Sequence, residues 1–423
     1  MLALQEALRS RYPHQSLQFL ITKSNAKAKT YDGICIGGER AAHEIEHCIH
    51  ELSCNGLHTR RISIVGYSMG GLIARYAIGV LFQNRLFDFV QPANFTTFAT
   101  PHIGASVKVF GGIDNLIDNF VSQRLSATGQ QLFLVDDHLG TGKPLLYLLA
   151  ERDSIFDQGL SCFQRFAAYG NITGDYCVPY TTAAFDLSNP WAELLPGSGQ
   201  KDTIKHANDA TVKDVSEGSS RAESTMPSRS SHAIRQVTAY TAFGIVSLMC
   251  IPPILAYSTY QTIISKRRIK QHRDGRTGIG TGRYCIGNTA ATTTTDRRSP
   301  FMTIRPAREQ SIQVECLLPT PPPTPPGSPN ASTIDPTLPQ SDTTSDEEKS
   351  DEASLMPMIS ATPALLQMKM EIAQNLDRFP FNKFPVRIQR TRHAHAAIIA
   401  RAPKKRFAEG RDVCEHWAQQ FVI

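Results

Sequence analysis

The pattern of apolar and polar positions predicts alternating strands and helices in the first half of the chain. Short runs of β-branched or aromatic residues, typical of buried strands, lie at 17–22, 61–65, 95–100 and 163–172. Apolar residues recur at helical spacing over 2–12, 37–53 and 70–82. This alternation favours an α/β fold, with a mostly parallel sheet flanked by helices on both faces. Residues 105–160 contain further helical patterns, which fit either a lid over the sheet edge or ordinary packing helices.

The middle of the chain breaks this alternation. After a polar stretch, residues 237–264 carry no charge and the basic run 266–273 follows directly. The uncharged run is longer than the ~20 residues needed to cross a bilayer, so it predicts membrane or lipid-surface contact. Pro252-Pro253 would break a straight helix, so interfacial helices or a shallow hairpin compete with a true span. A buried core helix is the soluble alternative.

A low-complexity segment then separates two ordered parts. It holds a Thr run, a Pro-rich stretch and an acidic run, and it lacks the apolar residues to offset chain entropy, so we expect disorder. Order returns with a helix capped by Thr362-Pro363, a strand at 384–388 and a terminal helix. We therefore predict five parts: a hydrolase core at 1–187, a linker at 188–236, the apolar segment at 237–264, a basic then disordered insert at 265–353, and a C-terminal part of the core at 354–423.

Composition narrows the possible classes. A chain of 423 residues that is 41% hydrophobic can bury a sizeable core, and the mild net charge of +6 without basic–aromatic interleaving argues against nucleic-acid binding. The nine cysteines are odd in number and form no C-x-x-C pair, which predicts reduced thiols and an intracellular setting. His43, His47 and His50 share a helix face only partly and have no Cys at zinc spacing, so we expect no metal, and no cofactor is predicted.

The strongest chemical signal is the sequence Gly66-Tyr-Ser68-Met69-Gly70, which lies between a predicted strand and a predicted helix. This G-x-S-x-G context is that of a nucleophile elbow. The turn is tight, so the positions two before and two after the serine should lack bulk. Ser68 would project at the carboxyl end of the strand, and the backbone N–H of Met69 would point to where an oxyanion forms.

Two later residues complete a candidate catalytic triad. Asp175 follows the strand at 163–172, although Gly-Asp is also a common turn pair. His395 precedes an apolar run and is preferred as the base, although His393 could take its place. Ser68, Asp175 and His395 follow the chain order of α/β-hydrolase triads. His102 lies too early for that order and is interpreted as a structural residue.

Several motifs in register resemble the serine esterases of the α/β-hydrolase superfamily, close to the fungal lipid-droplet phospholipases and monoacylglycerol lipases. The matching stretches are Lys23–Ala26, Thr30–Gly33, Gly37–Arg40, Gly66–Arg75, Thr97–Gly104, Gly174-Asp175 with Val178–Tyr180, and His393–Ile399. The resemblance implies that Ser68 is the nucleophile, Asp175 the acid and His395 the base, and that the substrates are acylglycerols or phospholipids.

The chain departs from the pattern of that family at its start. Family members begin with a strand and a His-Gly loop that supplies the second oxyanion donor, whereas no His-Gly dipeptide precedes Ser68 here. One such donor stabilises the transition state by roughly 3–4 kcal/mol. We therefore expect an α/β-hydrolase fold without the first strand and oxyanion loop. The alternative to an active lipase is a catalytically impaired lipid-surface scaffold or a truncated gene product.

The apolar segment sets an expectation for location. Ser68 and His395 lie on opposite sides of residues 237–264 in sequence, yet must meet for catalysis. A bend at Pro252-Pro253 would let the chain enter and leave a membrane on one side. We expect a protein on the surface of lipid droplets or the endoplasmic reticulum, with Lys266, Arg267 and Arg268 at the anionic lipid surface. The sequence leaves the oligomeric state open.

Overall fold

A computed structural model describes residues 1–105, 126–188, 190–191, 259–277 and 363–423. Most of the predicted polar linker 188–236, most of the uncharged segment 237–264 and residues 278–353 of the predicted insert lie outside these residues. Part of the 105–160 region lies outside them as well.

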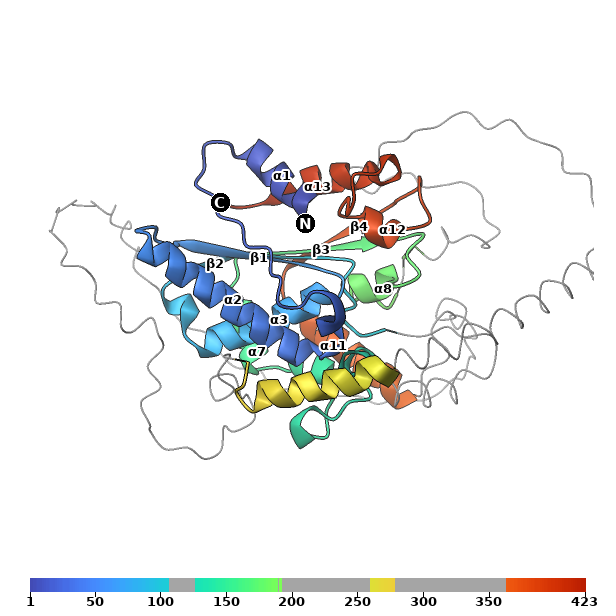
Figure 1. The fold of residues 1–423 in the computed structure, drawn as a ribbon. Coiled ribbons are helices and arrows are strands. Elements are labelled where there is room, and N and C mark those ends of the chain that lie inside the picture. Colours follow the sequence, from blue (N-terminus) through green and yellow to red (C-terminus); the bar gives the residue numbers. More distant parts are fainter. Residues whose placement is uncertain (106–125, 189, 192–258, 278–362) are drawn as a thin grey trace, which may run out of the picture. The chain divides into compact units, whose positions relative to one another are not determined.

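A four-stranded parallel sheet forms the centre of the fold (Figure 1). Its strands are β1 (Arg61–Tyr67), β2 (Gln91–Phe98), β3 (Arg165–Asn171) and β4 (Phe381–Val386), in the order β1-β2-β3-β4. β4 comes from the far end of the chain and pairs with β3 over six register positions, from Phe166 opposite Phe381 to Asn171 opposite Val386. The predicted fold class is confirmed, since a parallel sheet flanked by helices is an α/β-hydrolase-like arrangement.

Helices cover both faces of this sheet (Figure 1). One face carries α2 (Ile34–Cys54), α3 (Met69–Gln83), α7 (Ile155–Ser161) and α11 (Pro363–Leu376). The other carries α1 (Leu2–Arg11) and α13 (Glu409–Gln420). The shorter helical elements are η1 (Lys27–Tyr31), η2 (Leu86–Asp88), α5 (Ala127–Leu132), η3 (His138–Gly140), α6 (Leu145–Ala150), α8 (Tyr180–Ala183), α12 (Ala394–Ala397) and η6 (Lys405–Phe407).

Aromatic residues join the strands near their carboxyl ends. The rings of Phe98 and Tyr169 stack with centroids 4.7 Å apart, and Tyr169 stacks on Phe384 at the same distance. These three residues occupy successive strands in register. Trp417 of α13 contacts the Phe98 ring edge-on and donates a hydrogen bond from its indole N–H to Thr96 Oγ1. The C-terminal helix is thereby fixed to the N-terminal strands.

The strand predicted at 17–22 is wrong. These residues have no regular secondary structure and pair with none of the four described strands. Leu17 and Phe19 are partly buried against the hydrophobic cluster to which α1 and α13 contribute. Leu20 and Ile21 are 43% and 39% exposed. The residue alternation is that of a strand, but a strand also requires a neighbour to share its hydrogen-bond ladder.

Residues 259–273 form a helix that packs on the same face as α2 (Figure 1). Its buried residues are polar, with Gln261, Ser265 and His272 at most 7% exposed. Of the helices that the structure describes, none combines the length and apolar composition needed to cross a membrane.

Candidate active site

Ser68 lies in a strained turn between β1 and α3. Its backbone has φ 54° and ψ −133°, a conformation that non-glycine residues rarely adopt. The Ser68 N–H still donates to the carbonyl of Phe98 at 2.8 Å, so the pairing with β2 continues up to the serine. The side chain therefore emerges at the carboxyl edge of the sheet.

Close backbone approach explains the small residues of the turn, with one correction. A Cβ on Gly66 would lie 2.3 Å from the Cα of Gly71, and a Cβ on Gly71 would lie 2.2 Å from Thr100 Oγ1. A Cβ on Gly70 would meet nothing within 4 Å. The expectation that the second residue after the serine must lack bulk is wrong, because the steric constraint lies at Gly71.

The structure brings the three predicted residues together in one hydrogen-bonded series. His395 Nε2 lies 2.9 Å from Ser68 Oγ, and His395 Nδ1 lies 2.9 Å from Asp175 Oδ2. Ser68 follows β1, Asp175 follows β3 and His395 lies in α12, 327 residues after the serine. The carboxyl ends of parallel strands share one edge of the sheet, which allows such distant residues to meet.

Asp175 is held in place by its own turn. The Asp175 side chain has no exposed surface, and Oδ1 accepts the backbone N–H groups of Cys177 and Val178 at 3.0 and 2.9 Å. Asn171 Nδ2 donates to Oδ2 at 2.9 Å, beside the bond to His395. The two interpretations of Asp175 are thus compatible, because one carboxylate oxygen organises the turn while the other contacts the imidazole.

Tyr67 positions His395 from the opposite side. The Tyr67 hydroxyl donates to the backbone carbonyl of His395 at 2.8 Å, and the two rings lie 5.2 Å apart. Burial raises the pKa of Tyr67 to about 12, so the phenol keeps its proton and remains a donor. Sequence reasoning did not single out this role, since position x in G-x-S-x-G has no fixed chemistry. His393 is exposed, whereas His395 lies within hydrogen-bond distance of Ser68, so the geometry places His395 at the serine.

Met69 is the first residue of α3. Backbone N–H groups in the first turn of a helix have no intrahelical acceptor and lie at the positive end of the helix dipole. The Met69 N–H next to Ser68 is therefore suited to an oxyanion, and its role there stays a prediction.

His102 and Arg75 are both buried beneath the turn. His102 has no exposed surface, and its Nε2 lies 2.9 Å from Thr97 Oγ1. Burial, with the charges of Arg75 and Lys383, holds the pKa of His102 well below its usual value, so the ring is neutral. Burial also lowers the pKa of Arg75 to about 9. The structure places His102 in the core, away from the Ser68–His395 contact, and Arg75 was not identified from sequence because helical spacing suggested only packing.

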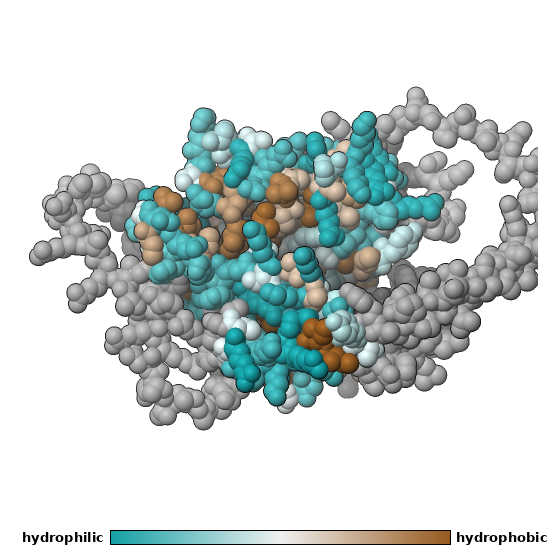
Figure 2. Space-filling view, viewed as in Figure 1, coloured by the Kyte–Doolittle hydropathy of each residue, from teal (hydrophilic) through white to brown (hydrophobic). Residues whose placement is uncertain are grey.

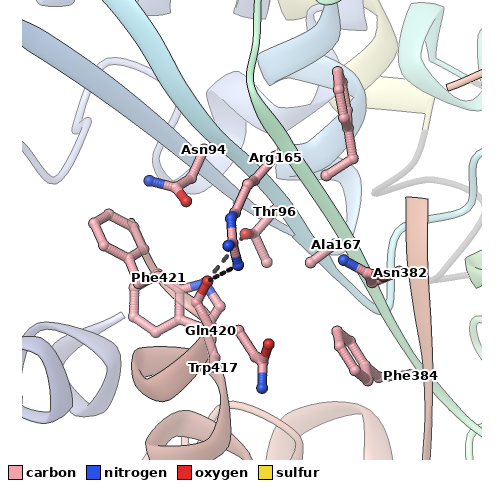
Figure 3. Close-up of a pocket in the computed structure, with 10 residues that line it drawn as sticks. Asn94, Thr96, Arg165, Ala167, Asn382, Phe384, Trp417, Gln420 and Phe421 are labelled. Atoms are coloured by element: carbon pink, nitrogen blue, oxygen red, sulfur yellow. Dashed lines mark hydrogen bonds between the residues drawn. The ribbon is translucent and has the colours of Figure 1, made fainter. Parts of the chain in front are cut away.

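A small hollow lies beneath α13, away from the triad (Figure 3). Its volume is about 20 Å³, and Arg165 at the start of β3 donates across it to the carbonyl of Gln420. That volume suits about one water molecule rather than a substrate. This hollow is therefore no candidate substrate site.

An α/β sheet that carries serine, histidine and aspartate in hydrogen-bonded series at its carboxyl edge has the geometry of a serine hydrolase site. Comparison with known proteins agrees: residues 1–189 match the family described as "Putative serine esterase (DUF676)". The resemblance to serine esterases that the motifs carry is thereby confirmed.

Relatives with curated names are yeast proteins. Over 175 residues the chain is 35% identical to "Putative lipase ROG1" of Saccharomyces cerevisiae. The aligned stretch covers 41% of this chain and 24% of that protein. Over 133 residues it is 33% identical to "Putative lipase C4A8.10" of Schizosaccharomyces pombe. This aligned stretch covers 30% of this chain and 16% of that protein. The chain thus spans less than a quarter of the length of these relatives. No solved structure matches.

Proposed function

We propose that this protein is a lipase-type serine hydrolase that cleaves carboxylic ester bonds of acylglycerols or phospholipids. The observation that carries the proposal is the continuous hydrogen-bonded series from Ser68 through His395 to Asp175. The family of residues 1–189 and the names of the yeast relatives support the lipase type. Substrate choice is our inference from those names and from the uncharged segment of the sequence.

The geometry supports an acyl-enzyme mechanism. His395 Nε2 accepts the Ser68 proton as Oγ attacks the ester carbonyl, and the resulting oxyanion accepts the N–H of Met69. The imidazolium is stabilised by the Asp175 carboxylate and then donates its proton to the departing alcohol. Water, deprotonated by His395, attacks the acyl-Ser68 ester, and the carboxylic acid leaves as Ser68 regains its proton.

We also propose that the enzyme works at a membrane or lipid-droplet surface. Its substrates would be poorly soluble in water, and residues 237–264 carry no charge and adjoin a basic run. This part of the proposal can be tested separately from the chemistry.

A fluorophosphonate probe tests the catalytic assignment on the full chain. Labelling should occur in the native protein and be absent in Ser68→Ala. His395→Ala should slow labelling by at least about 10³-fold, because the serine loses its base. His393→Ala is the matched control, since this neighbouring histidine is exposed, and it should label normally. Equal labelling of the two histidine variants would exclude His395 as the base. A native protein that fails to label would favour a non-catalytic lipid-surface role.

A further inference from the structure

The helix at 259–273 is attached to the core by its polar side. Arg268 makes a bidentate ion pair with Asp32, which also binds Arg40 at 2.9 Å and has no exposed surface. His272 Nε2 lies 2.6 Å from Glu39 Oε2, and Ser265 donates to the carbonyl of Tyr31. These contacts recur every third or fourth residue, so they fix one face of the helix on α2 and η1.

The expectation that Arg268 faces a lipid surface is wrong. Its side chain is only 21% exposed, because the buried carboxylate of Asp32 holds it against the core. The basic run therefore divides between two faces.

The opposite face combines basic and apolar side chains. Lys266, Arg267, Lys270 and Arg273 are exposed, together with Tyr260 at 58% and Ile263 at 49%. At 100° per residue these six positions fall on one side of the helix, opposite Gln261, Ser265, Arg268 and His272. Residues 259–273 contain no Asp or Glu, although Arg273 at the end of this face also lines a hollow with Asp136 and Asp137.

Figure 2 shows a small hydrophobic patch among hydrophilic residues in the lower part of the described surface. A soluble helix usually buries its apolar residues and exposes its polar ones. Here the ion-paired side is buried and an aromatic, an isoleucine and four cations face outward.

The direction of the helix relates this face to the active site. A short connection joins the end of α2 to the start of β1, so α2 begins at the carboxyl edge of the sheet, where Ser68 lies. Ser265 contacts Tyr31, before α2, whereas His272 contacts Glu39 within it. The N-terminal end of the helix, with Tyr260 and Ile263, therefore lies toward the catalytic edge. The last residues of the uncharged stretch, 259–264, form the first turns of this helix.

We propose that the outward face of helix 259–273, formed by Tyr260, Ile263, Lys266, Arg267, Lys270 and Arg273, docks on an anionic lipid surface. The cations pair with acidic headgroups, while Tyr260 and Ile263 enter the interfacial layer at the end nearest the catalytic edge. The buried ion pairs transmit this orientation to the core, so that Ser68 faces the surface bearing its substrate. The inference deepens the proposed lipase function and rests on it for the substrate.

Flotation of the full chain with vesicles tests the docking face. Vesicles of phosphatidylcholine alone are compared with anionic vesicles that contain about 30% phosphatidylserine. The native chain should prefer the anionic vesicles, and the preference should fall with added salt. The variant with Lys266, Arg267, Lys270 and Arg273 changed to Gln should lose that preference by roughly several hundredfold, since each of the four cations contributes roughly fivefold.

A second variant has the same charge change elsewhere. Arg60, Lys404, Lys405 and Arg411 are exposed and lie outside this helix, so their change to Gln should leave the preference nearly intact. Equal loss in both variants, or equal binding of the native chain to both vesicle types, would overturn the proposal. Preferential binding to a soluble polyanion such as polyuridylate, without vesicle binding, would also overturn it.

Ser68→Ala separates the two hypotheses. It should bind vesicles like the native chain, because flotation does not depend on hydrolysis. If the native chain prefers anionic vesicles but does not react with fluorophosphonate, only the catalytic assignment fails. If it reacts with fluorophosphonate but shows no vesicle preference, only the docking face fails.

Discussion

At the scale of single residues, the site depends on backbone positions where no side chain fits. Ser68 keeps a positive φ because β1 and α3 approach each other closely at Gly66 and Gly71. The neighbouring Gly70 bears no such constraint. Two adjacent glycines in the same helix turn therefore have different physical roles.

Gly71→Ala should destabilise the protein and Gly70→Ala should not. The new Cβ at position 71 would overlap Thr100, an overpacking that costs about 1–3 kcal/mol. At position 70 the Cβ enters open space in a helix, where Ala is favoured over Gly by up to about 1 kcal/mol. Thermal unfolding of both variants measures the difference. Equal melting temperatures would show that the turn relaxes around position 71.

His138 should make folding stability depend on pH. Burial and the charge of Arg273 lower its pKa from 6.5 to about 4, despite an opposing contribution from Asp137. The folded state thus binds fewer protons than the unfolded state between these values. Its stabilising contribution is present above pH 6.5 and is lost as the pH falls toward 4, amounting to about 2 kcal/mol by pH 5.

Denaturant unfolding at pH 7 and pH 5 checks the contribution of His138. His138→Gln should reduce the loss of stability between these values, whereas His58→Gln, at an exposed histidine, should not. An unchanged pH dependence in His138→Gln would contradict the shifted pKa.

At the scale of elements, the C-terminal part of the chain supplies one edge of the sheet and the catalytic histidine candidate. β4 pairs with β3, α12 presents His395 to Ser68, and α13 packs against α1. Trp417 links α13 to β2 through the Thr96 hydrogen bond and the Phe98 ring. Positioning of His395 is therefore coupled to how well α13 packs.

Trp417→Ala should lower the free energy of unfolding by about 3–5 kcal/mol, because a residue only 3% exposed leaves a cavity. Phe89→Ala is the matched aromatic control. Phe89 is 61% exposed, so its loss should change stability by less than about 0.5 kcal/mol. Urea unfolding measures both. Similar values for the two variants would mean that α13 contributes little to the core.

At the scale of the whole described unit, one carboxylate joins distant parts of the chain. Asp32 binds Arg40 within α2 and Arg268 from the helix at 259–273. When a buried carboxylate loses one of its cationic partners, its desolvation is no longer fully compensated and the folded state is destabilised. The attachment of this helix therefore depends on Arg268 more than on its exposed cations.

Arg268→Ala should detach the helix, and Arg267→Ala should leave it in place. Trypsin cleavage within 259–277, followed by mass spectrometry, should accelerate severalfold in Arg268→Ala because the helix loses its main ion pair. Arg267 is exposed and provides the control at the next position. Cleavage at the native rate in Arg268→Ala would show that the remaining contacts are sufficient.

The sequence by itself determined the elements with strong local signals. Periodicity predicted the helices that became α1, α2, α3, α11 and α13, and the β-branched or aromatic runs predicted β1, β2 and β3 near their observed positions. The G-x-S-x-G motif and the chain order of hydrolases identified Ser68, Asp175 and His395 as candidates. These features depend on neighbouring residues, so they can be read along the chain.

Only the tertiary structure decided the features that depend on distant residues. The run at 17–22 has strand alternation but no ladder partner among the described strands, so the pattern misled. His393 and His395 are alike in sequence, yet only the latter reaches Ser68. The basic run gave no sign that Arg268 faces a buried Asp32 while its neighbours face outward. In each case the deciding interaction joins residues far apart in the chain, and local periodicity carries no information about such pairs.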